Sequence, residues 1–291
     1  MKRIAIIGAG FMGSGIAQVC AQADYSVTLV DIAEDRLEFA RNAIAWSLNK
    51  LENKEQLDAP SKVVADRIQT STEYEVVGDA DLIIEAVYEN RDTKLNAIRA
   101  LDTLCRSDAI IGSNTSTIPI TQLAAASQHP ERVIGIHFFG PVPLMRLVEI
   151  TPAPTTSQTV IDTVMAFGRA VGKNPVLVKK DIPGFLMNRI FGAMTCEAIR
   201  LVEDGVGSIE DIDQGMCDGF NFRVGPLCIA DLAGLDIALN AFQVMHDLDP
   251  SRMPAPPALL ARMVAEGKLG AKSGEGFYRW EKNGRRLSPA F

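Results

Sequence analysis

Short apolar runs alternate with helical patterns over the first two thirds of the chain. The strand-like runs are residues 2–7, 26–30, 81–87, 109–113, 132–137, 146–150 and 175–178, and segments with helical periodicity separate most of them. This alternation predicts an α/β fold, a Rossmann-like, doubly wound and mostly parallel sheet. The connection between the runs 132–137 and 146–150 is short, which favours antiparallel pairing of those two strands.

Two stretches of the pattern depart from simple strand–helix alternation. Helical periodicity continues from residue 33 to about 53 and returns at 61–67, which predicts a helical excursion at about 33–67. After Pro183 and Gly184 we find only helical patterns, beginning with a helix of roughly 20 residues that Gly205 ends. We therefore expect an NAD-binding domain at 1–183 and an all-α C-terminal domain at 184–291. The broad apolar content of these later helices favours a homodimer formed through that domain.

The first apolar run leads directly into the sequence GAGFMG at residues 8–13, and a helical pattern follows. In a strand–turn–helix of this kind Gly8 allows the tight turn, Gly10 lets the backbone approach a pyrophosphate, and Gly13 lets the helix pack on the strand. Asp31 ends the second strand, where an acid binds the adenosine ribose and repels a 2′-phosphate. The expected cofactor is NAD.

Composition excludes several other classes of function. The chain has 29 basic and 36 acidic residues, a net charge of −7, and no dense basic run, which argues against nucleic acid as a partner. No apolar run approaches the ~20 residues of a spanning helix, and the chain enters a strand at once, so we expect no membrane partner and a cytoplasmic location. The five cysteines are scattered singly, which predicts neither a disulfide framework nor a metal site.

One histidine lies in a promising setting. His137 begins the segment HFFGPVPLMRLVE, which ends at Glu149. Histidine can accept an alcohol proton near neutral pH, and a nearby carboxylate would orient its ring. The alternative is a buried strand histidine beside an ordinary strand glutamate, and the two residues alone do not decide between these.

A second group of polar residues shares one helix face. Ser47, Lys50 and Lys54 have the spacing of such a face, which could receive an anionic group or be simply solvated. The spacing alone leaves both readings open.

Taken together, the motifs resemble those of the L-3-hydroxyacyl-CoA dehydrogenase family, and the likeness runs nearly end to end. The segments that carry it are GAGFMGSGIAQ at 8–18, IEAVYEN at 84–90, SNTST at 113–117, HFFGPVPLMRLVE at 137–149, KKDIPGFLMNR at 179–189 and KSGEGFY at 272–278. Several motifs in the right order are more specific than any one of them. The implied reaction is NAD-dependent oxidation of a 3-hydroxyacyl-CoA to the 3-ketoacyl-CoA, and its reverse.

The resemblance also implies roles for individual residues. His137 would be the catalytic base and Glu149 the acid that orients it, with Ser116 and Asn188 at the substrate. Contacts to NAD would come from Gly8, Gly10, Phe11, Met12, Gly13, Asp31, Glu89, Lys94, Ser116 and Lys272. Contacts to coenzyme A would come from Ser47, Lys54 and Ser116, which favours the anion-binding reading of the helix face.

One position departs from the family pattern. The family reads HFFNP where this chain has Gly140, so the amide expected to touch the nicotinamide is missing. The alternatives are the same chemistry on another hydroxy acid or on a carrier-protein thioester, or a non-catalytic NAD-binding protein. A serine hydrolase built on Ser116 is disfavoured, because no G-x-S-x-G elbow surrounds that serine. If Gly140 marks an altered acyl preference, Gly140→Asn should improve turnover of 3-hydroxybutyryl-CoA.

Overall fold

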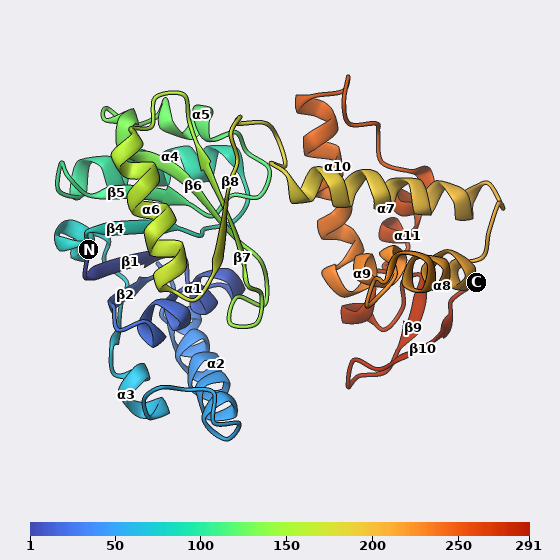
Figure 1. Ribbon diagram of the computed structural model, residues 1–291, viewed down its shortest axis with the longest axis horizontal. Helices are drawn as coiled ribbons and strands as arrows, with labels where there is room; N and C mark the ends of the chain where they lie inside the picture. The colour runs from blue at the N-terminus through green and yellow to red at the C-terminus, as the bar shows by residue number, and fades with distance from the viewer. The chain divides into compact units, whose positions relative to one another are not determined.

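The computed structural model describes residues 1–291, and the chain folds as two compact units. Unit 1 is Met1–Ile182 and unit 2 is Pro183–Phe291. Unit 1 is an α/β unit and unit 2 is mainly helical (Figure 1). The predicted fold class is therefore confirmed.

One eight-stranded sheet forms the centre of unit 1, in the order β3-β2-β1-β4-β5-β6-β7-β8. The strands are β1 (Arg3–Ile7), β2 (Ser26–Val30), β3 (Ile68–Ser71), β4 (Leu82–Glu85), β5 (Ile110–Ser113), β6 (Val133–Phe138), β7 (Leu147–Pro152) and β8 (Asn174–Leu177). Neighbouring strands are parallel except β6 and β7, which pair antiparallel as predicted. The carboxyl ends of β1, β4, β5 and β6 therefore meet at one edge, where ligands of doubly wound sheets bind.

Helices cover both faces of this sheet. The α-helices are α1 (Phe11–Gln22), α2 (Glu34–Glu52), α3 (Ser61–Ala65), α4 (Arg91–Leu104), α5 (Ile120–Ala124) and α6 (Gln158–Ala170), and two short 3₁₀ turns are η1 (Tyr74–Asp79) and η2 (Pro130–Arg132). Ile16 of α1 and Val164 of α6 belong to one buried apolar core with alternate strand residues such as Ile134 and Ile150. Helices α4 and α5 pack against β4, β5 and β6.

The helical excursion is present, but it ends in a strand that the sequence pattern did not predict. Helix α2 is 19 residues long and α3 follows it, as expected. The missed strand is β3, which pairs with β2 at the edge of the sheet. Its residues, IQTS, are only partly buried or exposed. An edge strand of this kind lacks the apolar run on which the prediction depended.

Unit 2 contains α7 (Met187–Glu203), α8 (Ile209–Phe220), α9 (Pro226–Ala233), α10 (Leu235–Leu248), α11 (Ala258–Ala265) and the 3₁₀ turn η3 (Ala271–Ser273). Gly205 follows the end of α7 with φ +68°, and the Ser208 side chain caps α8, both as expected. Taken singly, none of the helices has the length and apolar composition to cross a membrane. Helices α9 and α10 meet that test only as a pair, with a 100° bend between them.

The helical character expected after residue 184 is confirmed, but helices alone do not describe the last residues. Strands β9 (Tyr278–Trp280) and β10 (Arg286–Pro289) pair antiparallel. Asp231 of α9 holds the first of them: its buried carboxylate accepts hydrogen bonds of 2.9 Å from the backbone N–H groups of Phe277 and Tyr278 and from Nε1 of Trp280. Burial raises the pKa of Asp231 against the lowering effect of these bonds.

Candidate active site

The glycine turn after β1 is built as a dinucleotide-binding turn requires. Gly8 has φ +102°, and a Cβ there would lie 2.6 Å from the carbonyl oxygen of Ala86, which follows β4. A Cβ on Gly13 would overlap the carbonyl oxygen of Gly8. Gly10 faces open space, and α1 begins directly after it with no side-chain cap. The N–H groups and dipole of α1 are thus directed toward the place where a pyrophosphate would lie.

Asp31 lies beside this turn at the end of β2. Its carboxylate accepts hydrogen bonds from the backbone N–H groups of Ala9, at 2.8 Å, and Ala33, at 3.1 Å. A pocket of about 410 Å³ opens next to it, lined by Ala9, Gly10, Asp35, Arg36 and Phe39. The open turn, the acid and this pocket fit the phosphate and adenosine parts of NAD.

His137 and Glu149 lie directly opposite each other on β6 and β7. His137 Nδ1 is 2.8 Å from Glu149 Oε2, and the two side chains are 8% and 0% exposed. The ring of Phe139 lies beside the imidazole, with centroids 4.5 Å apart. Asn114, just after β5, fixes the end of β6 by accepting a hydrogen bond from Phe138 N. The antiparallel register therefore produces a buried histidine–carboxylate pair.

Glu89 organises the loop that carries Ser116. Its Oε1 accepts hydrogen bonds from the backbone N–H groups of Ser116 (2.8 Å) and Thr117 (3.1 Å) and from the hydroxyls of Thr115 (2.7 Å), Ser116 (3.1 Å) and Thr117 (3.2 Å). Burial pushes the pKa of Glu89 upward, but the charge of Lys94 and these bonds outweigh it and hold the pKa below its usual value. Two of the residues assigned to the cofactor, Glu89 and Ser116, are thus in direct contact.

Lys94 lies beneath this loop. Its Nζ is 2.7 Å from Glu85 Oε1 and 3.3 Å from Glu89 Oε2, and its side chain is 1% exposed. Glu85 is completely buried at the end of β4 and also accepts a hydrogen bond of 2.6 Å from Ser113 Oγ. Burial lowers the pKa of Lys94, but the two carboxylates more than compensate and raise it above its usual value.

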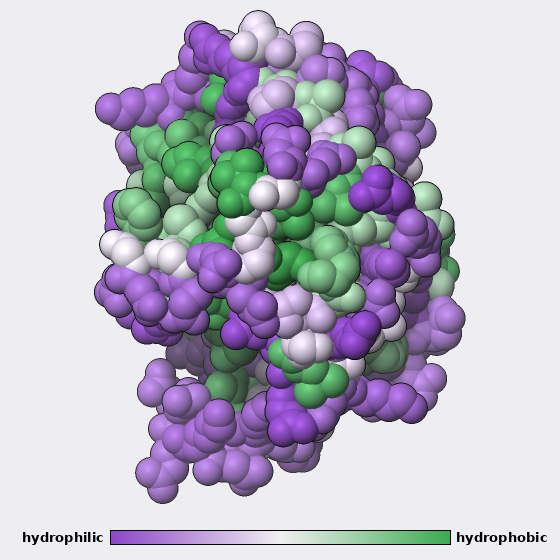
Figure 2. All heavy atoms as spheres, turned by 90° about the vertical axis from the view of Figure 1, so that its right-hand side faces the viewer, coloured by the Kyte–Doolittle hydropathy of each residue, from purple (hydrophilic) through white to green (hydrophobic).

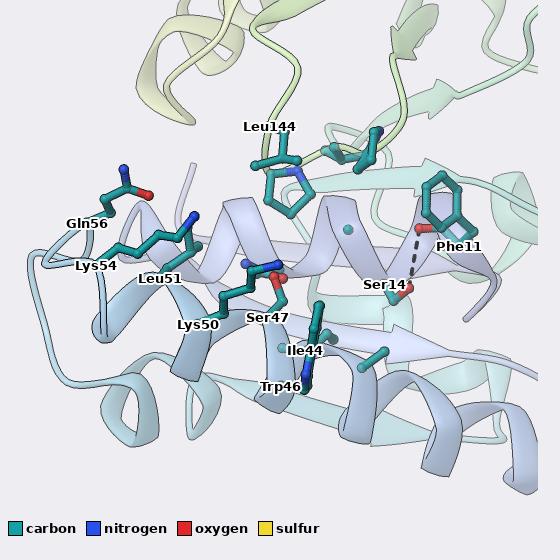
Figure 3. A pocket seen from close by; sticks show the side chains of 16 residues that line it. Phe11, Ser14, Ile44, Trp46, Ser47, Lys50, Leu51, Lys54, Gln56 and Leu144 are labelled. Atoms are coloured by element: carbon teal, nitrogen blue, oxygen red, sulfur yellow. Dashed lines mark hydrogen bonds between the residues drawn. The ribbon is translucent and has the colours of Figure 1, made fainter. Parts of the chain in front are cut away.

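A second pocket, of about 450 Å³, contains two of the three residues assigned to coenzyme A, Ser47 and Lys54. The third, Ser116, is not part of its lining and lies on the loop that Glu89 holds. Figure 3 shows Ser47 and Lys50 on α2 and Lys54 just past its end on one side of the pocket, and Leu144, from the segment after β6, on the other. Trp46 stands at the rim, 66% exposed, with Lys50 Nζ 4.8 Å from the centre of its ring. The pocket thus combines apolar walls with two ammonium groups, which suits a ligand that carries both apolar parts and phosphates.

The remaining assigned residues lie at two places. Phe11 and Met12 begin α1, beside Gly140. Asn188 and Lys272 belong to unit 2, where Asn188 lies in the first turn of α7 and Lys272 in η3, with Nζ 2.6 and 2.8 Å from the two oxygens of Asp236.

Sequence reasoning missed two buried residues that support the site. Glu85 pairs with Lys94, and Lys173 donates hydrogen bonds to the carbonyl oxygens of Val142 (2.5 Å) and Met145 (2.9 Å), which belong to the segment that walls the second pocket. Burial lowers the pKa of Lys173. A charged residue inside the apolar strand run LIIE was the signal available for Glu85, whereas nothing in the local sequence identifies Lys173.

Comparison with known proteins agrees with this geometry. Residues 3–182 match the family model of the 3-hydroxyacyl-CoA dehydrogenase NAD-binding domain, and residues 184–280 match that of the C-terminal domain. A probable 3-hydroxybutyryl-CoA dehydrogenase of Deinococcus radiodurans is 42% identical, over 96% of this chain and 100% of its own length. The mitochondrial hydroxyacyl-coenzyme A dehydrogenase of Sus scrofa is 39% identical, over 97% and 92%.

A solved structure gives the same result over both units. The (S)-3-hydroxybutyryl-CoA dehydrogenase from Ralstonia eutropha superposes with a TM-score of 0.92 at 40% identity, covering 97% of this chain and 100% of that one. The chain therefore belongs to the 3-hydroxyacyl-CoA dehydrogenase family, and it is an NAD-dependent oxidoreductase that oxidises 3-hydroxyacyl-CoA.

Proposed function

We propose that His137 is the general base of this oxidation and that Glu149 orients it. The observation that carries the proposal is the buried pair itself, with Nδ1 and Oε2 2.8 Å apart on directly opposed residues of β6 and β7. A carboxylate at Nδ1 selects the tautomer with its proton on that nitrogen, which leaves Nε2 as the basic atom. Nε2 takes the proton of the substrate hydroxyl, and Glu149 stabilises the imidazolium that forms.

NAD supplies the hydride acceptor for the carbon that bears this hydroxyl. Gly10 and the start of α1 bind its pyrophosphate, on the turn that Gly8 and Gly13 shape, and Asp31 binds the adenosine ribose. Glu89, Lys94 and Lys272 complete the cofactor contacts, along with Phe11 and Met12. Ser116 holds the reacting oxygen of the substrate, on a loop that Glu89 keeps in place, and Asn188 contacts the substrate from unit 2.

The pocket beside α2 binds the coenzyme A part of the substrate. Ser47 and Lys54 contact it, and Lys50 adds a second positive charge near its phosphates. The exposed ring of Trp46 offers an aromatic face at the rim, beside these charges. This arrangement favours a coenzyme A thioester over a carrier-protein thioester, because the latter lacks the adenine nucleotide.

Glu149→Gln tests the proposed pair. An amide donates or accepts at Nδ1 but cannot stabilise imidazolium, so we expect kcat for 3-hydroxybutyryl-CoA oxidation to fall by about 10² or more, with an unchanged Kd for NADH. A fall of less than threefold would remove Glu149 from the mechanism. If the Kd for NADH rises in parallel with the loss of rate, the pair has a structural role instead.

Lys54→Ala tests the proposed pocket. Loss of one lysine–phosphate contact should raise KM for acetoacetyl-CoA about 3- to 10-fold and leave KM for acetoacetyl-pantetheine unchanged, because pantetheine lacks the nucleotide. Lys62→Ala, an exposed lysine of α3 outside the pocket, is the matched control. An equal change in KM for both thioesters would contradict the proposal. Turnover of a free hydroxy acid at a rate that Lys54→Ala does not change would favour the alternative substrate class.

Unit 2, which corresponds to the C-terminal domain expected at 184–291, also forms the homodimer interface in this proposal. Figure 2 shows apolar side chains gathered on the face it views, and the exposed apolar residues of unit 2 include Ile190, Val206, Phe220, Leu232 and Ile237. Light scattering should give a dimer at micromolar concentration, and a monomer would contradict this.

The proposed location is the cytoplasm, which suits five cysteines without a disulfide. Recovery of the protein in another cell fraction would contradict it.

A further inference from the structure

The ring of Phe11 occupies the space that a side chain at position 140 would need. A Cβ on Gly140 would lie 2.6 Å from Phe11 Cε1 and 3.3 Å from its Cζ, and 3.4 Å from the sulfur of Met12. The first distance is well below any carbon–carbon contact in a folded protein. The ring in its present place and a side chain at 140 are therefore mutually exclusive.

This exclusion is the structural reason for a glycine here. Gly140 does not have a positive φ, so its backbone conformation does not itself require glycine, and what a side chain lacks there is space. The conflicting atoms are the far end of an exposed side chain, since Phe11 is 68% exposed at the start of α1. A substitution at 140 would therefore turn the ring away and leave the backbone where it is.

The position of the ring connects three parts of the site. Phe11 directly follows Gly10 of the glycine turn, lies against Gly140 in the segment after β6, and lines the pocket that contains Ser47 and Lys54. In Figure 3 it stands at one end of that pocket, away from Lys54 and Gln56 at the other. With the phosphates of coenzyme A at the lysine end, the thioester arm runs toward Phe11.

We propose that Phe11 is a specificity-determining residue that works as a pair with Gly140. The ring supplies an apolar contact to the cofactor and to the thioester arm at the place where the family pattern has the amide of an asparagine. The glycine is what allows the ring to lie there. Both contacts rest on the proposed function, which places Phe11 at the cofactor, whereas the steric pairing of Phe11 with Gly140 does not.

A double-mutant cycle with Phe11→Leu and Gly140→Ala tests the pairing. Leucine lacks the ring atoms that a Cβ at 140 would meet, and alanine adds that Cβ without adding an amide. Two quantities are measured for each protein: the Kd for NADH from its fluorescence, with no thioester present, and KM for acetoacetyl-CoA. Gly215→Ala, at a helical glycine of unit 2 with open space around it, controls for the general effect of replacing glycine.

We expect Gly140→Ala to raise both the Kd for NADH and the KM about 3- to 10-fold in the wild-type background. The reason is that the Phe11 side chain must leave its preferred rotamer and loses its contact with the ligands. In the Phe11→Leu background Gly140→Ala should change the Kd and the KM by less than about twofold. Phe11→Leu alone should raise KM by about the same 3- to 10-fold factor as Gly140→Ala in the wild type. Gly215→Ala should change neither quantity.

If the free-energy effects of the two substitutions simply add, the pairing is overturned. Wild-type values of Kd and KM in the Phe11→Leu protein would overturn it as well. If Gly140→Ala fails to fold, Phe11→Leu alone still decides, because it removes atoms and creates no overlap. A protein that binds NADH with the predicted non-additivity but turns over no thioester would contradict the proposed function and leave the pair intact. The pairing also revises the sequence-based expectation for Gly140→Asn, because the Phe11 ring fills the space that the new side chain needs. Gly140→Asn should improve turnover in the Phe11→Leu background and not in the wild type, and improvement in the wild type alone would contradict the pairing.

Discussion

Replacing Lys94 by methionine should destabilise unit 1 strongly. Lys94 is the positive partner of two carboxylates, and its side chain is 1% exposed. Methionine has similar length and fills the same space, so the change removes the charge with little loss of packing. Glu85, which is completely buried, would keep its hydrogen bonds from Ser113 and Val87 but would lose its counterion.

Breaking a buried ion pair from one side costs about 3 to 5 kcal/mol, because the remaining charge stays in a low-dielectric environment. We therefore expect the free energy of unfolding of unit 1 to fall by about that amount at pH 7. Glu85→Gln in the same protein should recover part of the loss, since it removes the orphaned charge. Lys62→Met, which breaks an exposed pair on α3, should cost less than about 1 kcal/mol.

The pH dependence of the wild type follows from the same pKa shifts. The raised pKa of Lys94 gives stability that is complete below its unfolded value of 10.5 and is lost as the pH rises through the folded value. The lowered pKa of Glu89 gives stability that is present above 4.5 and is lost as the pH falls. The contribution of the network is therefore complete from about pH 5 to pH 10.

Urea unfolding followed by hydrogen exchange of the amides in β4 and β5 measures this free energy for unit 1 alone. A loss below about 1 kcal/mol for Lys94→Met, equal to that of Lys62→Met, would refute the reasoning.

Two further predictions concern single carboxylates. Asp81 accepts hydrogen bonds from the backbone N–H groups of Lys2 and Arg3 and from Arg106, and these outweigh burial and lower its pKa to about 2. Asp81→Asn should lower the free energy of unfolding by about 1 to 2 kcal/mol at pH 7, measured by urea unfolding. Because a lowered pKa gives stability that is lost as the pH falls, the difference between variant and wild type should vanish between about pH 4 and pH 2. A difference that does not depend on pH would contradict this. Asp231→Ala would leave three buried donors unpaired, two in β9 and one on Phe277 just before it, so the free energy of unfolding of unit 2 should fall by about 3 kcal/mol or more. Hydrogen exchange in β9 should accelerate, and unchanged exchange there would show that other contacts hold the strand.

The parts of this fold that follow a strong local pattern could be predicted from the sequence. The strands that lie in buried, apolar runs were predicted at nearly their observed positions, and the glycine turn and Asp31 follow directly from strand–turn–helix spacing. The partly exposed β3 was missed, as were β9 and β10. Strand β9 depends on Asp231, 46 residues or more before its partners in sequence, which no local pattern can show.

The candidate site shows the same division. His137 and Glu149 could be nominated from their chemistry, but only the β6–β7 register makes them directly opposite neighbours, and a shift of one residue would send the two side chains to opposite faces of the sheet. Gly140 was visible in the sequence as a missing amide, whereas the ring of Phe11 that fills its place was not. That contact joins residues from distant parts of the chain and depends on the tertiary fold alone.

The most direct test of the account is the rate at which acetoacetyl-CoA oxidises NADH, measured by absorbance for the wild type and for His137→Ala. The account predicts brisk oxidation of NADH and little of NADPH, a fall in kcat of about 10² to 10⁴ in the variant, and an unchanged Kd for NADH. A variant that keeps its kcat, or a wild type that binds NADH and does not oxidise it with this thioester, would contradict the central claim.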